Sequence, residues 1–193
     1  MNKRKINIAI FASGSGTNAQ AILEYFSGNN LVDIKCIYSN NPSAYALTRG
    51  KNSGTNTYTF SRNDFYKSNQ VQDHLISHKI DLIILAGFMW LVPSSLVDKF
   101  TILNIHPALL PKYGGKGMYG DFVHKAVIKN GETESGITIH YVNNEYDKGD
   151  IIVQATCPVL ATDSPDLLAK KIHTLEHKHY PETISKIVKK LLS

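Results

Sequence analysis

INIAIFASGSGTN, the stretch at residues 6–18, decides the fold. Its first six residues form an apolar run of strand length, and a glycine-rich turn follows at residues 14–17. Residues 18–26 then place Ala19, Ile22, Leu23 and Phe26 at helical spacing. A strand, a glycine turn and an amphipathic helix form the first half of a βαβ unit, which predicts an α/β protein with a parallel sheet.

Segments of strand length and helix length continue to alternate along the chain. We expect strands at residues 33–38, 55–60, 82–86 and 101–105, and a helix at residues 65–78. Residues 82–86 are an unbroken apolar run, which is typical of a strand that is covered on both faces. This strand should therefore lie at the centre of the sheet.

The pattern changes in the last third of the chain. Two strand-like runs at residues 135–142 and 151–157 flank a polar turn, which predicts a hairpin added to the sheet. Ser164, Pro165 and Asp166 are typical of a helix start, and the final helix should reach about Tyr180 before Pro181 breaks or restarts it. The predicted fold is an open, doubly wound, mostly parallel, Rossmann-like sheet with helices on both faces and an antiparallel addition near the C-terminal part. We expect residues 1–193 to form one domain.

Composition excludes several classes of protein. The 193 residues are 42% hydrophobic and 19% charged, which is too apolar for a disordered chain. No apolar run approaches the roughly 20 residues of a membrane span. The formal charge of +5 lacks a basic stripe interleaved with aromatic residues, so we expect no nucleic-acid partner. Cys36 and Cys157 are isolated in apolar runs, which indicates free thiols and a cytoplasmic protein.

The glycine turn at residues 14–18 is a candidate anion site. Backbone N–H groups and the helix dipole meet at such a turn, and with Ala19 it fits the dinucleotide pattern G-x-G-x-x-A. A nicotinamide site also needs an acidic residue after the second strand, where this chain has Ser39-Asn40-Asn41. A phosphomonoester is therefore favoured over NAD, and a purely structural glycine turn is the remaining alternative.

Leu103-Asn104-Ile105-His106-Pro107 is the most informative polar segment. Alternation along a strand points Asn104 and His106 to the same side, where both could donate hydrogen bonds to an oxygen that gains negative charge. A structural Asn and His at a strand end is the alternative. Asp147 lies in a turn, and it would raise the pKa of His106 and orient its ring if the fold brings the two together.

Residues 173–177, His-Thr-Leu-Glu-His, match the metal-binding pattern H-x-x-E-H. The chain has little room for a later acidic ligand, so we expect no metal site. Glu176 and His173 instead form one polar face of a helix, directed toward a ligand or solvent.

Four segments carry a family resemblance: SGSGTN at residues 13–18, AGFM at 86–89, NIHPALLPKY at 104–113 and DKGDII at 147–152. Together they resemble the phosphoribosylglycinamide formyltransferase family, which are folate-dependent enzymes of purine synthesis. Other formyltransferases share the second pair of motifs, but the glycine loop and the chain length favour this family. The resemblance implies formyl transfer from 10-formyltetrahydrofolate, as co-substrate, to the amine of 5-phosphoribosylglycinamide, with these small molecules as partners, in a monomer or homodimer. It implies no metal and no NAD.

The resemblance also assigns the site residues. It implies that Asn104, His106 and Asp147 are catalytic, that Gly16, Thr17 and Asn18 bind the substrate phosphate, and that Glu176 with His173 holds the glycinamide end. The residues that it implies for the folate are Arg62, Met89, Trp90, Leu91, Val92, Asn104, Asn143, Asn144, Glu145, Tyr146 and Asp147.

We expect the substrate amine to attack the formyl carbon while Asn104 and a protonated His106 donate to the formyl oxygen. Asp147 should keep the ring charged and assist proton transfer through water. The chain departs from many relatives in the long glycine-rich loop at residues 114–124, in Phe122 and in Trp90. Hydrolysis of formyltetrahydrofolate and a nucleotide-binding module without chemistry are the competing interpretations.

Overall fold

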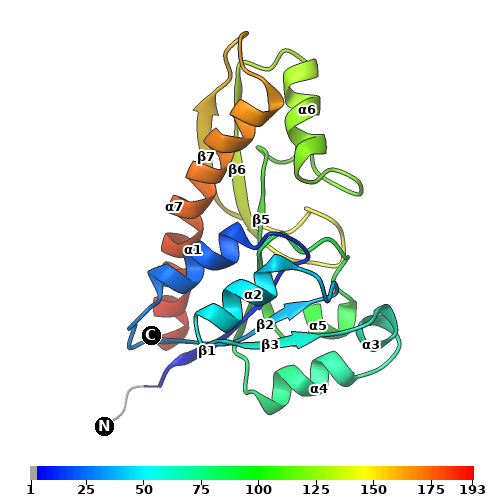
Figure 1. The fold of residues 1–193 in the computed structure, drawn as a ribbon, viewed down its shortest axis with the longest axis vertical. Helices are drawn as coiled ribbons and strands as arrows, with labels where there is room; N and C mark the ends of the chain where they lie inside the picture. Colours follow the sequence, from blue (N-terminus) through cyan, green and yellow to red (C-terminus); the bar gives the residue numbers. More distant parts are fainter. Residues whose placement is uncertain (1–3) are drawn as a thin grey trace.

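The computed structural model describes residues 4–193, and its framework is one seven-stranded sheet in the order β3-β2-β1-β4-β5-β6-β7 (Figure 1). The strands are β1 (Ile6–Phe11), β2 (Val32–Ser39), β3 (Asn56–Thr59), β4 (Leu82–Leu85), β5 (Thr101–His106), β6 (Glu134–Tyr141) and β7 (Ile151–Pro158). The helices are α1 (Thr17–Tyr25), α2 (Tyr45–Asn52), α3 (Arg62–Tyr66), α4 (Gln70–Ser77), α5 (Ser94–Val97), α6 (Asp121–Lys129) and α7 (Pro165–Leu192).

The sheet has the predicted mixture of strand directions. Strands β1 to β5 pair in parallel, whereas β6 pairs antiparallel with both β5 and β7. The predicted hairpin and the antiparallel addition are therefore confirmed. Strand β4 lies in the middle of the order and all four of its residues are buried, as its unbroken apolar sequence predicts.

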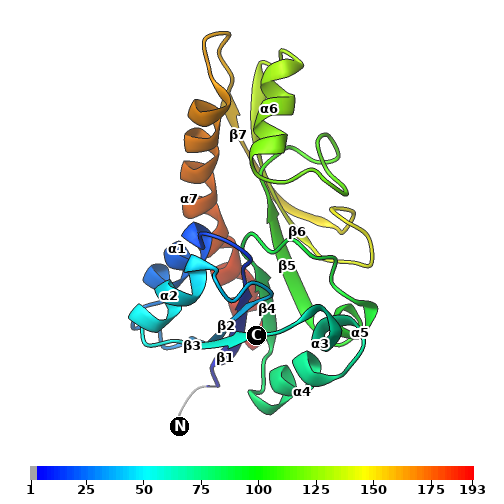
Figure 2. The ribbon, with the colours of Figure 1, turned by 45° about the vertical axis from the view of Figure 1, so that its right-hand side comes forward.

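Helices cover both faces of the sheet, and Figure 2 shows α1, α2 and α7 on one side and α3, α4 and α5 on the other. Alternation along β1 supplies both cores. Ile8 and Ile10 pack in the cluster that includes α1 and α7, while Ala9 and Phe11 pack in the cluster that includes α4 and α5. The carboxyl ends of the parallel strands are thus held rigidly between two packed layers.

Helix α7 corrects one prediction. It runs unbroken from Pro165 to Leu192, with Pro181 inside it. A proline removes one backbone N–H, which costs about 3 kcal/mol in a helix interior. Here the buried face continues beyond the proline through Ile184 and Val188, so packing on the sheet outweighs that cost. Within the described chain, neither this helix nor any other is long and apolar enough to cross a membrane.

The other differences concern helices. The predicted helix at residues 65–78 is two helices, because Ser61 and Asp64 form a capping box that starts α3 early, and α4 starts anew at Gln70. Helices α2, α5 and α6 were not expected. Helices α2 and α5 are short and carry few apolar residues, so their helical spacing is weak. Helix α6 does have an apolar face at Val123 and Val127, which the sequence analysis did not use.

Candidate active site

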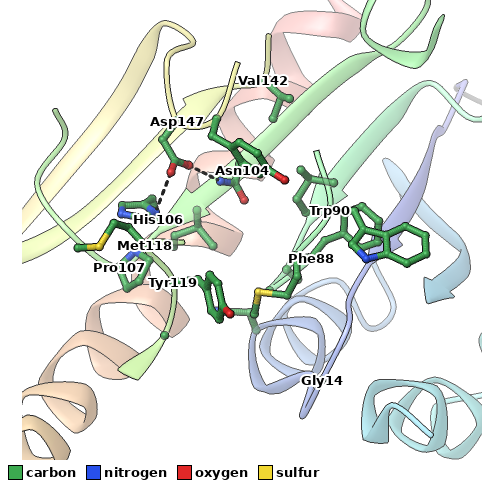
Figure 3. A pocket seen from close by; sticks show the side chains of 18 of the residues that line it. Gly14, Phe88, Trp90, Asn104, His106, Pro107, Met118, Tyr119, Val142 and Asp147 are labelled. Atoms are coloured by element: carbon green, nitrogen blue, oxygen red, sulfur yellow. Dashed lines mark hydrogen bonds and ion pairs between the residues drawn. The ribbon is translucent and has the colours of Figure 1, made fainter. Parts of the chain in front are cut away.

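Loops at the carboxyl ends of β1, β4 and β5 surround one cavity of about 520 Å³. Ligands bind at this edge in open α/β sheets, and the prediction that the three polar segments meet there is confirmed. The turn before β7, the loop at residues 115–120 and helices α6 and α7 complete the wall. The lining side chains reach inward from segments far apart in the sequence (Figure 3).

The structure brings Asn104, His106 and Asp147 together. Asn104 and His106 are two residues apart on β5 and point to the same side, as strand alternation predicts. The Asn104 Nδ2 atom lies 3.5 Å from Asp147 Oδ1. The His106 Nδ1 atom lies 3.5 Å from Asp147 Oδ2. One carboxylate therefore faces both an amide and an imidazole within a single cavity.

Asp147 is held in place by its own backbone and by the loop above it. Its φ of 56° is in the left-handed region, where Asp is among the tolerated residues. The Gly115 N–H donates to Asp147 Oδ2 at 2.9 Å. Burial raises the pKa of Asp147, but its interactions with His140, His106 and the Gly115 N–H together outweigh burial, so the net pKa lies below the usual range. The side chain is accordingly an anion at neutral pH.

The turn that carries Asp147 depends on a close backbone approach. A Cβ at Gly149 would lie 1.7 Å from the Tyr141 carbonyl oxygen, so only glycine fits there. The Tyr141 N–H in turn donates to the Asp150 carbonyl at 2.9 Å. The turn is therefore pinned directly against the end of β6.

His106 differs from the expectation of a charged ring. Burial is the largest influence and lowers its pKa, and the neighbouring Asp147 charge and Tyr113 carbonyl raise it by less. Its Nε2 atom lies 2.7 Å from the Tyr113 carbonyl oxygen, which can only accept, so this nitrogen carries a proton. Desolvation therefore outweighs the ion pair that the sequence predicts, and the net pKa of His106 lies below its usual value.

His140 was missed by the sequence reasoning. It is paired directly with Asn104 across β5 and β6, so the two side chains share a face of the sheet. His140 Nδ1 donates to the Tyr141 carbonyl at 2.8 Å, which leaves Nε2 as an acceptor in the neutral ring. That atom lies 3.2 Å from Asn104 Nδ2, so His140 fixes the orientation of the amide. Only the strand register, which sequence spacing did not supply, could have identified it.

The glycine loop has the geometry of an anion site. Gly16 caps α1 with a φ of 71°, and a Cβ there would lie 2.6 Å from the Ala46 Cβ. No side chain caps the helix and its first turn has no acidic residue, so its N–H groups are free for a ligand. Asn40 accepts from the Ser13 hydroxyl, and Asn41 donates to the Ser13 carbonyl. The segment after β2 therefore braces the loop, where a nicotinamide site would place an acid.

Glu176 reaches the cavity from α7 and is buried. Its Oε2 accepts from Asn18 Nδ2 at 3.0 Å. Burial raises the pKa of Glu176 to about 7, against the smaller effect of the Asn18 hydrogen bond. His173 also lines the cavity, whereas His177 does not. Within residues 4–193 no group of three His, Cys, Asp or Glu side chains is placed to hold a metal ion.

The segments that the family resemblance assigns to folate divide into two sets. Residues 89–92, with Glu145 and Tyr146, line the cavity. Asn143 and Asn144 do not, and Asn143 Oδ1 instead accepts from the Glu145 N–H at 2.9 Å, which shapes the turn. Arg62 also lies outside the lining, and its guanidinium stacks 5.5 Å from the centre of the Trp90 ring.

Comparison with known proteins identifies the family. The formyl transferase family model matches residues 6–184. The chain belongs to the formyl transferase family. A phosphoribosylglycinamide formyltransferase of Escherichia coli is 36% identical over 188 residues, which cover 93% of this chain and 86% of that protein. A chloroplastic phosphoribosylglycinamide formyltransferase of Arabidopsis thaliana is 38% identical over 192 residues, or 95% of this chain and 66% of that protein.

Solved structures agree with that membership. The crystal structure of phosphoribosylglycinamide formyltransferase from Anaplasma phagocytophilum has a TM-score of 0.88 and 34% identity, covering 96% of this chain and 88% of that chain. The glycinamide ribonucleotide transformylase 1 from Symbiobacterium toebii has a TM-score of 0.86 and 33% identity, covering 96% and 88% respectively. The Rossmann-like fold and the enzyme class that the sequence predicts are thus confirmed.

The glycine-rich loop and Trp90, which the family resemblance singles out as departures, both line the cavity. The loop at residues 115–120 lines the cavity, and its Tyr119 ring meets the exposed Phe122 ring edge to face at 5.3 Å. The Trp90 ring packs edge-on against Phe60 and tilted against Phe65 and Tyr66, with its centre about 6 Å from each of theirs.

Proposed function

We propose that this formyltransferase transfers the formyl group of 10-formyltetrahydrofolate to the amine of 5-phosphoribosylglycinamide, with residues 1–193 as one catalytic domain. The observation that carries the proposal is the single cavity in which the glycine loop faces the cluster of Asn104, His106 and Asp147. The names of the similar proteins support the same pair of substrates.

Each end of the cavity suits one substrate. The first turn of α1, at Gly16, Thr17 and Asn18, offers N–H groups to the phosphate, and Glu176 and His173 accept the glycinamide end. The lining at residues 88–92 is apolar and suits the pterin ring of the folate. Arg62 lies over the Trp90 ring, outside the cavity lining, where its charge would meet the carboxylates of the folate tail.

The chemistry follows from the donors at the centre of the cavity. The free-base amine attacks the formyl carbon, a C–N bond forms, and the formyl oxygen becomes negative. Asn104 and His106 donate to that oxygen, and His106 does so after its Nε2–H leaves the Tyr113 carbonyl. The tetrahedral intermediate collapses as the bond to the folate nitrogen breaks. Asp147, the neighbouring anion, directs the proton through water from the attacking to the leaving nitrogen.

A coupled assay tests this function directly. The absorbance of the folate is followed with 5-phosphoribosylglycinamide as acceptor, and the formylated product is identified by mass. We expect formyl transfer that depends on the acceptor, and release of formate without acceptor would overturn the proposal. In Asn104→Ala, loss of one oxyanion donor should lower kcat by about 10² to 10³ with little change in KM.

A further inference from the structure

His124 lines the cavity from the first turn of α6 and has no part in the chemistry described above. Its side chain is buried, with 3% of its surface exposed. The Nδ1 atom is sealed from solvent and has no hydrogen-bond partner. The other ring nitrogen, Nε2, is not sealed in this way, so it is the nitrogen left to face the cavity.

A second unpartnered atom lies in the same cavity. Within residues 4–193, three sealed side-chain polar atoms lack a partner, namely Asn18 Oδ1, His124 Nδ1 and Asp163 Oδ1. Asn18 and His124 both line the cavity. Buried polar groups almost always have partners in folded proteins, and the exceptions need an explanation. A ligand in the cavity cannot reach these sealed atoms, so the Nε2 atom of His124, which is not sealed, is the one that such a ligand would meet.

His124 presents a neutral donor. Burial lowers its pKa, and the nearby His173 and His106 lower it further, while Asp121 opposes them less strongly. An orphaned N–H is more costly than an orphaned lone pair, so the proton belongs on Nε2 and the bare lone pair on the sealed Nδ1. The cavity therefore meets an uncharged N–H at this point, which suits an oxygen acceptor.

The neighbours of His124 indicate which part of the substrate it faces. His173 belongs to the α7 side of the cavity, and His106 belongs to the cluster that performs the chemistry. In the proposed function the phosphate would lie at the N–H groups of α1, which line the same cavity. We infer that His124 Nε2–H donates a hydrogen bond to a sugar oxygen of the phosphorylated amine. The inference rests on the proposed function for the identity of that substrate.

Three variants of His124 separate a binding role from a packing role. The amide of His124→Gln places a donor near the position of Nε2, and that of His124→Asn places one near Nδ1. His124→Leu keeps the bulk and removes both nitrogens. Val127→Ala is the matched control, because Val127 is buried in the same helix and does not line the cavity. Calorimetry measures the Kd of 5-phosphoribosylglycinamide, of ribose 5-phosphate and of inorganic phosphate for each protein.

We expect the Kd of both sugar phosphates to rise about 10-fold in His124→Leu and in His124→Asn, and to stay within about 3-fold of wild type in His124→Gln. The Kd of inorganic phosphate should not change in any variant. Equal Kd values in wild type and His124→Leu would overturn the inference. So would equal weakening in all three variants together with a Tm loss like that of Val127→Ala, because that result indicates packing alone.

Two further outcomes are distinguishable. Weakening of 5-phosphoribosylglycinamide without weakening of ribose 5-phosphate would move the contact to the glycinamide and overturn the sugar assignment. Failure of the wild-type protein to transfer formyl groups would refute the proposed function, whereas the binding measurements would still decide the role of His124.

Discussion

Asp147→Asn probes the centre of the site with the smallest change in shape. Asparagine tolerates the left-handed backbone at this position as aspartate does, so the turn should persist. The amide oxygen should keep the 2.9 Å contact from the Gly115 N–H, which is the shortest that Asp147 makes. The new NH₂ group then stands where Oδ1 was, 3.6 Å from His140 Nε2 and 3.5 Å from Asn104 Nδ2.

That geometry sets the size of the effect. The new NH₂ competes with Asn104 for the only acceptor that His140 offers, so the oxyanion donor loses its fixed orientation. Loss of one such donor lowers kcat by about 10² to 10³. A hydrogen bond to a charged group becomes a neutral one, which costs about 1 kcal/mol of unfolding free energy. A fall in Tm of roughly 2–4 °C is expected for a chain of this size.

The same variant tests the electrostatics of His106. The Asp147 charge raises the pKa of His106 against the larger effect of burial, so its removal should move that pKa further down. An NMR titration of the ring and the pH dependence of kcat measure this shift. Asp150→Asn is the control, because it removes an exposed carboxylate from the same turn. Wild-type kcat together with an unmoved His106 titration in Asp147→Asn would refute the reasoning.

Three other changes have definite outcomes. His140→Phe keeps an aromatic ring but removes the atom that accepts from Asn104, so kcat should fall about 10-fold while substrate binding is unchanged. An unchanged kcat would show that the contact between His140 and Asn104 is not needed. Gly149→Ala forces a Cβ to within 1.7 Å of the Tyr141 carbonyl oxygen, so the turn that carries Asp147 must shift. Activity should be lost while Tm falls only modestly, as activity assays and melting curves run in parallel would show. Glu176 has a folded pKa of about 7, above its usual 4.5, so its contribution to stability is present below pH 4.5 and is lost by about 3 kcal/mol as pH rises through 7. Glu176→Gln should abolish that part of the pH dependence of Tm, and a slope that persists in the variant would contradict the assignment.

The parallel part of the sheet was predictable because short stretches of sequence determine its strands and their burial. The unbroken apolar run at residues 82–86 is shielded from water only when both faces of the strand are covered, so β4 lies at the centre of the sheet. The strand period likewise placed Asn104 and His106 on one side. Pro181 was misjudged because its effect on the helix is local, whereas burial of the residues around it is a tertiary gain that no short pattern reveals.

The sequence predicted which residues form the site better than it predicted their pKa values. The motifs and the family resemblance correctly predicted that Asp147 lies close to His106. The carboxylate also raises the His106 pKa, which is the expected direction. The net shift of the His106 pKa is nevertheless downward, because the imidazole is more deeply buried than the strand sequence indicates. His124 and His140 were missed for a related reason. The position of each depends on packing or strand register, and neither stands in a motif.

The antiparallel strands explain how the proposed catalytic cluster is assembled beside β5. In a parallel neighbour to β5, the next strand would reach the cavity only through its carboxyl-end loop. The antiparallel β6 instead runs past that edge and places His140 opposite Asn104 before its own following turn brings Asp147 back. A slip of one residue in this register would send His140 to the opposite face and leave Asn104 without its acceptor. The proposed reactive cluster is therefore a product of strand direction, and in the proposed function the glycine loop after β1 holds the substrate that the cluster acts on.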